Sequence, residues 1–506
     1  MMNIAIDKQS PIPVYQQIYN QIREMVLTGV LPPGFQLPPE RKLALRLGVN
    51  RSTVLNAYRE LKADAFIDSH IGRGTVVISQ AAKEPDREPQ EVNPLPWRQF
   101  LSEGAARMQQ PLVSEILKNA NRKDVISFAA GFSAYHDDPI DELLATQKRL
   151  LADYGGMALQ YSASEGHYPL RESLCQWMEA RGIQAAPEEV AVLAGSQQGI
   201  DLTARIILDP GDIVVVEEPT FFSALQIFQS AGARIIGVPI DRNGMRVDML
   251  ESLLERLKPK LIYTIPTFQN PSGAVMDMQR RQQLLNLAYR YRVPILEDDP
   301  YGELRYEGSR LPSLKALDRY DHVIYLSSFS KIMFPGLRVG WVTAAQPLVR
   351  QYVLAKQMAD LHTNSLAQWL MDDFLRRGLM QKQAERVKVA NHRSRDVMAE
   401  ALAQSAGANL EWEIPEGGLY FWCRLPEGIN QHMLVAKASE KKVVFVPGHI
   451  FYPGNSGPNY IRLSFGSADP ELIKPGIRAL MAAVAELLDQ MPPSGPVAEM
   501  EIKPIL

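Results

Sequence analysis

The sequence predicts an α/β protein with two folding parts, a small helical head and a large domain built on a mostly parallel β-sheet. In residues 1–80, short helical patterns are followed by a β-branched segment punctuated by glycines. Residues 81–110 hold four prolines among charged side chains, which favours an extended linker. In residues 111–490, short β-branched runs alternate with longer helical patterns, as in sheets covered by helices on both faces. Residues 491–506 are typical of a C-terminal tail.

The composition is that of a globular protein without a membrane span. Of the 506 residues, 46% are hydrophobic and 22% are charged, which is enough apolar material for a large core. No apolar run approaches the ~18 residues that a membrane-spanning helix needs, and no signal peptide pattern is present. Two cysteines, Cys175 and Cys423, are too few for a disulfide framework, and no His/Cys cluster indicates a metal. We therefore expect a cytoplasmic protein without a bound metal.

Charge is distributed unevenly along the chain. The formal net charge is −3, but residues 1–80 contain nine Lys or Arg against six Asp or Glu, a net of +3. The rest of the chain therefore carries −6. A mildly basic head on an acidic body indicates that the head has an anionic partner.

The head contains three predicted helices. Apolar residues recur at helical spacing over residues 14–27 and predict an amphipathic helix. A second helix starts at Pro38–Glu40, because proline suits the first helical turn. After it, Gly48 allows a tight turn with positive φ, and a third helix opens at Asn50.

The spacing of the second and third helices is that of a helix-turn-helix, in which the second of the two enters the major groove of DNA. Arg51 can bind guanine edges or phosphates, and the hydroxyls of Ser52 and Thr53 suit phosphates. Residues 66–77 predict a hairpin, a wing with Arg73 at its Gly-Arg-Gly tip. The turn alone fits a small helical docking domain equally well, but the wing and the basic start of the helix favour DNA binding.

Segments 36–44, 48–54 and 57–61 resemble the winged helix-turn-helix of the GntR family, and the resemblance covers about residues 12–77. It implies that double-stranded DNA is contacted by the start of the second helix, the polar start of the third helix and the wing. By position these residues are Arg41, Asn50, Arg51, Ser52, Thr53 and Arg73.

The strongest chemical pattern of the large domain follows its last strand-like run. The strand-like runs are Val190–Leu193, Ile213–Val216, Arg234–Val238, Leu261–Thr264, Pro294–Glu297 and Val323–Leu326. In the segment that follows the last of these runs, Lys331 could form a Schiff base with an aldehyde. The hydroxyls of Ser328 and Ser330 could donate to phosphate oxygens, and the guanidinium of Arg338 could neutralise them. An ordinary solvent-exposed lysine is the alternative interpretation.

This segment resembles the Schiff-base segment of fold-type I pyridoxal phosphate enzymes, the aspartate aminotransferase class. The resemblance covers about residues 111–490 and implies a mostly parallel sheet with a smaller C-terminal α+β subdomain. It implies that pyridoxal 5'-phosphate is the cofactor and that Lys331 carries it. It also places Asp298 on the pyridinium nitrogen, and Tyr301 and Asn270 on the ring oxygen. From the residues alone, Asp299 is an equal rival of Asp298.

Other positions concern the phosphate, the ring and the substrate. Ser196 and Gln197 open a helix whose N-terminal amides suit a phosphate, although an ordinary strand-to-helix turn fits as well. The resemblance gives the ring-stacking position to Phe221, with Phe222 as its rival. It further implies contacts to the neighbouring subunit's phosphate by Tyr161, to the α-carboxylate of an amino acid by Arg462, and to the substrate by Gly131.

Head and body together resemble the MocR subgroup of GntR regulators. This resemblance implies a homodimeric transcriptional regulator whose aminotransferase-like domain senses an amino-acid or amine effector through Lys331. The alternative is an active aminotransferase of amino acids and 2-oxo acids with an attached head, supported by the catalytic positions Lys331, Asp298 and Tyr301. A third hypothesis is a sensor of pyridoxal phosphate itself, for which Arg462 would matter little.

Overall fold

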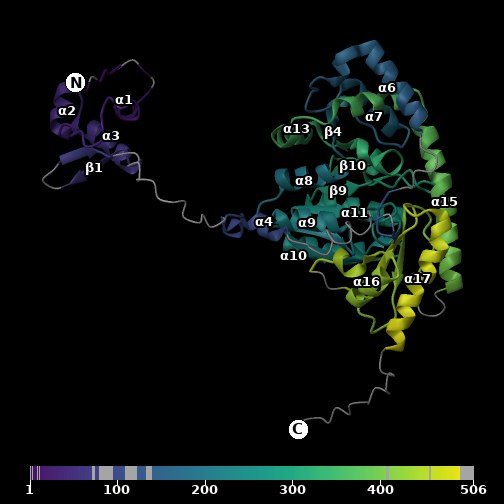
Figure 1. Cartoon of the computed structure of the whole chain (residues 1–506). Coiled ribbons are helices and arrows are strands. Elements are labelled where there is room, and N and C mark those ends of the chain that lie inside the picture. The colour runs from purple at the N-terminus through teal and green to yellow at the C-terminus, as the bar shows by residue number, and fades with distance from the viewer. Residues whose placement is uncertain are drawn as a thin grey trace, which may run out of the picture. The chain divides into compact units, whose positions relative to one another are not determined.

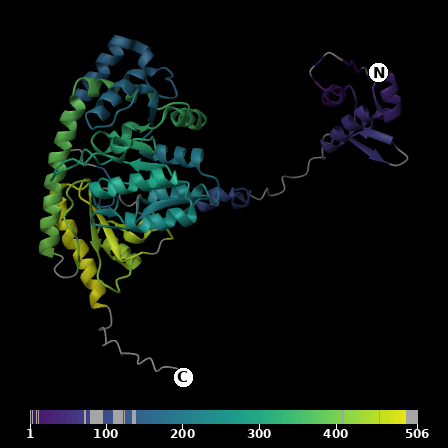
Figure 2. The same cartoon turned by 180° about the vertical axis from the view of Figure 1, so that it is seen from behind.

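The computed structural model describes residues 2, 4–7, 10, 12–70, 74–78, 95–108, 122, 124–132, 139–405, 410–454 and 457–490. Its contacts divide the chain into two units, Met1–Trp97 and Arg98–Leu506. Figures 1 and 2 show the units from opposite sides. No described helix is both long enough and apolar enough to cross a membrane.

The first unit is a three-helix bundle followed by a hairpin, as the sequence predicts. Its elements are α1 (Val14–Leu27), α2 (Glu40–Leu47), α3 (Arg51–Ala63), β1 (Ile67–His70) and β2 (Gly74–Val77). One face of each helix enters a shared core, with Ile18, Leu43 and Val54 fully buried. Gly48 ends α2 with a φ of 63°, the left-handed conformation that the sharp turn into α3 requires. The tip of the wing, with Arg73, lies outside the described residues.

The second unit is built on an eight-stranded sheet. Its strands are β4 (Val190–Leu193), β5 (Ile213–Glu218), β6 (Arg234–Asp241), β7 (Gly244–Met245), β8 (Leu261–Thr264), β9 (Ile295–Asp298), β10 (Val323–Ser328) and β11 (Gly340–Thr343). Their order is β4-β11-β10-β9-β8-β5-β6-β7. The five strands from β10 to β6 are parallel, whereas β11 is antiparallel to both of its neighbours. The predicted mostly parallel sheet is therefore confirmed.

Helices cover both faces of this sheet. The helices of the unit are α4 (Glu103–Arg107), α6 (Ile140–Tyr154), α7 (Tyr168–Glu179), α8 (Ser196–Ile207), α9 (Phe222–Ser230), α10 (Val247–Leu257), α11 (Met278–Tyr291), α12 (Leu314–Leu317), α13 (Gln346–Asp360), α14 (Ser365–Arg376), α15 (Leu379–Ser405), α16 (Gln431–Glu440) and α17 (Pro470–Asp489). Alternate residues of β5 show the two layers. Val214 and Val216 enter one core with α8 and α9, whereas Val215 enters another with α10 and α11.

A smaller α+β part completes the unit. It contains a three-stranded sheet, in the order β12-β15-β14, of β12 (Tyr420–Arg424), β15 (Tyr460–Ser464) and β14 (Val446–Pro447). Short strands β3 (Ile126–Ser127) and β13 (Val443–Val444) pair beside it. The long helix α15 runs along one edge of the unit, packing on α14 and on α17 (Figures 1 and 2).

Four strands run further than their apolar patterns predict. β5 continues to Glu218, β6 to Asp241, β9 to Asp298 and β10 to Ser328. The reason is that the ladder pairs backbone groups whatever side chains they carry. The polar residues at these carboxyl ends therefore stay in the sheet while their side chains line cavities beside it.

Candidate functional site

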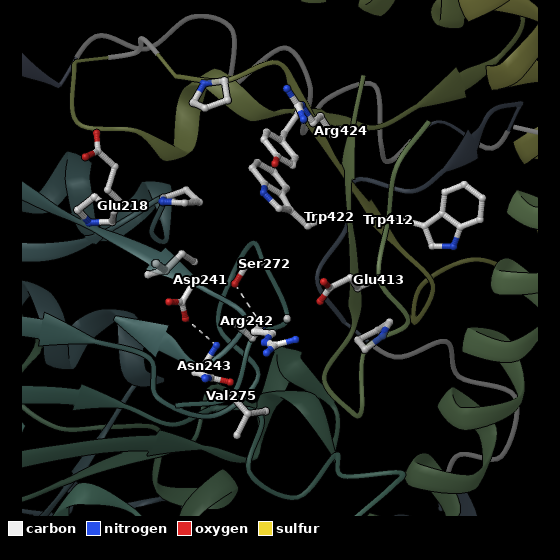
Figure 3. Close-up of a pocket in the computed structure, with 18 of the residues that line it drawn as sticks. Glu218, Asp241, Arg242, Asn243, Ser272, Val275, Trp412, Glu413, Trp422 and Arg424 are labelled. Carbon is white, nitrogen blue, oxygen red and sulfur yellow. Dashed lines mark hydrogen bonds between the residues drawn. The ribbon is translucent and has the colours of Figure 1, made fainter. Parts of the chain in front are cut away.

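A cavity of about 710 Å³ opens at the carboxyl ends of the parallel strands, where open α/β sheets commonly bind ligands. It is lined by every predicted cofactor and substrate position except Tyr161. These residues are Gly131, Ser196, Gln197, Phe221, Asn270, Asp298, Tyr301, Ser328, Ser330, Lys331, Arg338 and Arg462. A larger cavity, of about 1150 Å³, contains none of them (Figure 3). No metal-binding cluster of His, Cys, Asp or Glu exists among the described residues.

Lys331 enters the cavity from a 3₁₀ turn, Phe329–Lys331, that directly follows β10. Its Nζ donates a hydrogen bond to the carbonyl oxygen of Gly131 at 2.6 Å. Burial lowers the pKa of the Lys331 ammonium group, against the opposing effects of Tyr420 and Asp298. A lowered pKa increases the fraction of neutral amine, which is the form that attacks a carbonyl carbon.

Asp298 presents an unsatisfied carboxylate oxygen to the same cavity. Its Oδ2 accepts a hydrogen bond from the Tyr263 hydroxyl at 3.0 Å, whereas its Oδ1 is buried and has no hydrogen-bond donor among the described residues. Burial raises the pKa of the carboxyl group to about 7. A cationic N–H donor would satisfy Oδ1 and would lower that pKa.

Asp299, the rival of Asp298, lies away from this cavity. Its Oδ2 accepts from the Tyr325 hydroxyl at 3.0 Å, and its backbone carbonyl accepts from Ser327. Successive residues of an extended segment point to opposite faces, so only one of the two carboxylates can line the cavity. Of the two aspartates, Asp298 is the one that lines the cavity.

Three hydrogen-bonding side chains of the cavity wall lie close together. The hydroxyls of Ser328 and Ser330 are 2.7 Å apart, and Nη1 of Arg338 lies 3.5 Å from the Ser330 hydroxyl. Nη2 of Arg338 donates to the carbonyl of Ala194 at 2.7 Å, just before α8 begins at Ser196. A guanidinium, two hydroxyls and a helix N-terminus form a suitable cradle for a phosphate dianion.

Another part of the cavity wall is formed by Arg462, which is buried on β15. Its Nη1 donates to Oδ1 of Asn270 and its Nη2 to the carbonyl of Ala129, both at 2.8 Å. Its Nε is buried and has no acceptor among the described residues. A carboxylate could take up this unsatisfied donor.

Tyr301 is held between two polar neighbours. Its hydroxyl accepts from Nδ2 of Asn270 at 3.2 Å and lies 3.1 Å from the hydroxyl of Tyr420. Burial raises the pKa of Tyr301 well above its ordinary value. The group is therefore a neutral phenol that can still donate a proton in a hydrogen bond.

Sequence reasoning missed Tyr263 and Tyr420. Both stand in strands where an aromatic residue is typical of a core, so no local signal marks them. Tyr263 donates a hydrogen bond to Asp298, and the centroid of the Tyr420 ring lies 4.2 Å from the guanidinium carbon of Arg462.

Both rivals for the stacking position, Phe221 and Phe222, line the cavity, with ring centroids 5.3 Å apart.

The remaining predicted residues lie elsewhere. Tyr161 is 84% exposed and touches only the edge of the His362 ring among the ring contacts described. In the head, Arg41, Asn50, Arg51 and Ser52 are exposed and Thr53 is half-buried. Arg51 stands on the first turn of α3 and pairs with Oε2 of Glu40 at 3.2 Å, a contact that sequence reasoning did not foresee.

Comparisons with known proteins follow the same division into head and body. Residues 14–77 match the family of bacterial regulatory proteins called the gntR family. Residues 123–480 match the family of class I and II aminotransferases, which is more than half of the chain.

Some relatives match the chain over both parts. The HTH-type transcriptional regulator YisV of Bacillus subtilis, named as uncharacterized, is 30% identical over 481 residues, which are 95% of this chain and 98% of that protein. The probable rhizopine catabolism regulatory protein MocR of Rhizobium meliloti is 28% identical and covers 96% of each chain.

A solved structure matches the body alone. It is LysN, an α-aminoadipate aminotransferase of Thermus thermophilus, in complex with N-(5'-phosphopyridoxyl)-L-leucine. It is 37% identical, has a TM-score of 0.74, and covers 78% of this chain and 100% of its own.

Proposed function

This chain belongs to the family of class I and II aminotransferases, with a GntR family head in the MocR arrangement, and from that premise we propose that it is a DNA-binding transcriptional regulator controlled by a pyridoxal phosphate site. The head binds double-stranded operator DNA, and the body senses a small amino-group ligand. One observation carries the proposal. Lys331, the unsatisfied carboxylate of Asp298 and the guanidinium of Arg462 face one cavity in a chain that also has a DNA-binding head.

The residues of the cavity fit pyridoxal 5'-phosphate, which is the cofactor of the body. The unsatisfied Oδ1 of Asp298 suits a pyridinium N–H, and the amine of Lys331 suits an aldehyde carbon. The cradle of Ser328, Ser330 and Arg338 suits the phosphate. When bound, the cofactor supplies an aldehyde that condenses with amines and a ring that withdraws electrons from them.

The protein's own groups bind and orient the ligand. Arg462 offers its unsatisfied Nε–H to a carboxylate, which favours α-amino acids over simple amines. The side-chain amide of Asn270 accepts a hydrogen bond from the Arg462 guanidinium and donates one to the Tyr301 hydroxyl, so it orients both groups. Burial lowers the pKa of the Lys331 ammonium group, which favours the neutral amine that can accept a proton.

Regulation requires that the ligand bind one conformation of the chain more tightly than another. We propose a cytoplasmic homodimer whose two heads read two DNA half-sites. Exposed apolar residues along α6 and the following turn support a subunit interface there. They are Ile140, Leu144, Tyr154, Met157, Leu159 and Tyr161. Tyr161 would then reach the cofactor phosphate of the partner subunit.

An active aminotransferase with an attached head is the second candidate. The observation that favours it is the complete catalytic set, since Lys331, Asp298 and Tyr301 all line the cavity. A body kept only to sense a ligand would tolerate the loss of some of these groups. The two functions are compatible in one chain.

The test follows the cofactor absorbance of the full-length holoprotein during titration with the common amino acids. Binding to DNA selected from a random pool by the same protein is measured in parallel, together with release of 2-oxo acid. We expect one amino acid to change the absorbance and the DNA affinity without steady 2-oxo acid production. Steady production without any effect on DNA would establish the aminotransferase instead.

Lys331→Ala and Asp299→Asn are the matched variants for this test. The first removes the amine from the cavity, and the second changes a buried carboxylate that does not line it. The amino acid should change the absorbance of Asp299→Asn but not that of Lys331→Ala. Identical spectra of Lys331→Ala and the wild type would overturn the cofactor assignment.

A further inference from the structure

A second cavity, of about 1150 Å³, lies between the eight-stranded and the three-stranded sheet (Figure 3). Glu218 at the end of β5 and residues 240–243, at the end of β6 and directly after it, form its wall on the side of the large sheet. Trp422 and Arg424 of β12 enter it from the small sheet. Its volume is at or above the upper end of the range typical of small-molecule sites, ~300–1,000 Å³. The function proposed above uses none of its residues.

The charges that line this cavity are mostly negative. Six carboxylates and two guanidinium groups belong to the wall, namely Glu218, Asp241, Asp277, Glu411, Glu413, Glu416, Arg242 and Arg424. Asp241 pairs with Arg280 at 2.5 Å, and Asp277 accepts from a backbone N–H at the start of α11. Glu416 and Glu411 pair with Arg305 and Arg424, respectively. An anionic ligand would meet repulsion here, whereas a cation would be attracted.

Among the six carboxylates of this cavity, that of Glu218 is partly buried and has no counter-ion among the described residues. Its carboxylate accepts no hydrogen bond and forms no ion pair with the described residues, and the residue is half-buried. Gly237 permits its close approach to the sheet, since a Cβ there would come within 2.6 Å of the Glu218 Oε2. Burial raises the pKa of this carboxyl group, and no cation of the described residues compensates. Withdrawing a carboxylate from water without a partner costs free energy that a bound cation would recover.

Aromatic rings from the small sheet line the same cavity as Glu218 (Figure 3). The rings of Trp422 and Tyr460 are stacked, with centroids 5.0 Å apart and an interplanar angle of 3°. Tyr452 also lines this cavity, and burial, followed by the neighbouring Tyr460 and Glu218, raises the pKa of its hydroxyl. Ring faces attract organic cations, most strongly where a carboxylate is also present.

We propose that this cavity is a second ligand site, which binds a small organic cation, an ammonium group on an apolar skeleton. Glu218 is its counter-ion, and Trp422 and Tyr460 are its aromatic wall. A metal ion fits less well, because the described residues contain no cluster of three or more metal-ligating side chains. This proposal stands independently of the function proposed above.

The test uses choline as the ligand and the full-length holoprotein. Its quaternary nitrogen cannot condense with an aldehyde, so choline reports on the second site and not on the site of Lys331. Isothermal titration calorimetry should show saturable binding by the wild type. Glu218→Gln should weaken it about tenfold, and Trp422→Leu should weaken it by a similar factor. The uncharged isostere 3,3-dimethylbutan-1-ol should bind the wild type about tenfold more weakly than choline.

Two variants control for indirect effects. Glu411→Gln removes an exposed carboxylate of the same cavity that is already paired with Arg424, and Lys331→Ala alters only the cofactor site. Both should bind choline as the wild type does. The proposal is overturned if the wild type shows no saturable choline binding, if Glu218→Gln binds choline as tightly as the wild type, or if the isostere binds as tightly as choline.

Discussion

Asp298 shows how single residues set the chemistry of the cofactor cavity. Asp298 and Asp299 carry the same side chain, are both buried, and each have an Oδ1 without a donor among the described residues, yet only Asp298 lines the cofactor cavity. Tyr263 satisfies the other oxygen of Asp298 and thereby fixes the orientation of the carboxylate. The backbone direction, and not the residue type, therefore distinguishes the two neighbours.

Replacing Asp298 by Asn should weaken cofactor binding by about 10- to 100-fold, because a charge-assisted hydrogen bond to the pyridinium is lost. Asp299→Asn should bind the cofactor nearly as the wild type does, since that carboxylate faces Tyr325. Equilibrium titration of the two apoproteins with pyridoxal 5'-phosphate, followed by absorbance, measures both affinities. Equal losses in the two variants would contradict the assignment.

The raised pKa of Asp298, about 7, also predicts how the apoprotein responds to pH. In the folded state the carboxyl group keeps its proton to a higher pH than in the unfolded chain. Its contribution to stability is therefore present below its ordinary pKa, at about pH 4, and is lost as the pH rises through about 7. Apo Asp298→Asn lacks this loss. The melting temperature of the variant minus that of the apo wild type should therefore increase from about pH 5 to about pH 8. Calorimetry measures both melting temperatures at each pH, and a difference that stays constant with pH would contradict this prediction.

At the scale of elements, the start of α8 is shaped by Gly195. Its φ of 91° is unfavourable for other residues, and a Cβ there would lie 2.3 Å from Nη2 of Arg338. The absence of a side chain at this position lets the guanidinium approach the N-terminus of the helix. The phosphate cradle thus depends on one glycine at the junction of a strand and a helix.

Gly195→Ala should displace Arg338 and weaken binding of pyridoxal 5'-phosphate about tenfold or more, since one charge-assisted contact to the phosphate is disturbed. Gly336→Ala is the matched control, because nothing lies within 4 Å of a Cβ there and its φ is not positive. Competition with inorganic phosphate separates an effect on the phosphate cradle from an effect on the ring. If Gly195→Ala bound cofactor and phosphate as tightly as the control, the cradle would lie elsewhere.

The start of α3 is the corresponding element of the head. Arg51 is exposed there and pairs with Glu40, which lies on the first turn of α2. An exposed ion pair of this kind contributes only ~0–1 kcal/mol to stability, so DNA phosphates can compete for the arginine. The pair holds the guanidinium at the helix N-terminus before DNA arrives.

Arg51→Ala should weaken DNA binding about tenfold and lower the slope of log affinity against log salt by about one. Glu40→Gln should strengthen binding, because it removes a negative charge and releases Arg51. Arg59→Ala, which removes an exposed charge later on the same helix, should have a smaller effect. Fluorescence anisotropy with labelled DNA at several salt concentrations measures all three. Unchanged affinity in Arg51→Ala would remove this residue from the interface.

Local signals predicted elements better than they predicted contacts. The three helices of the head were predictable because prolines and Gly48 mark their ends locally. β11 was not, because a short strand inserted antiparallel between β4 and β10 has no distinctive pattern. The bond from Arg462 to Asn270 joins residues 192 positions apart, so the sequence could suggest each residue but not their contact. Glu218 and Trp422 likewise come to line one cavity only once both sheets have formed.

At the scale of the whole molecule, Tyr161 is the predicted site residue that a single chain does not bring to the cavity. It is 84% exposed and stands beside an exposed apolar stretch of α6 and the turn after it. A large aromatic side chain exposed to this extent is typical of an interface rather than of a monomer surface. In the proposed dimer, Tyr161 of one chain would complete the cofactor site of the other.

A shared site can be tested by mixing two defective chains. Tyr161→Ala should bind the cofactor more weakly through loss of a phosphate contact, and Lys331→Ala should lose the cofactor absorbance that depends on the lysine. In a mixed dimer, one of the two sites combines the intact Lys331 of one chain with the intact Tyr161 of the other. After the two variants are unfolded and refolded together, high-affinity, lysine-dependent absorbance should therefore reappear at a cofactor concentration that loads neither parent. A mixture that behaves as the average of its parents, although size-exclusion chromatography shows dimers that exchange chains, would mean that each site is built from one chain alone.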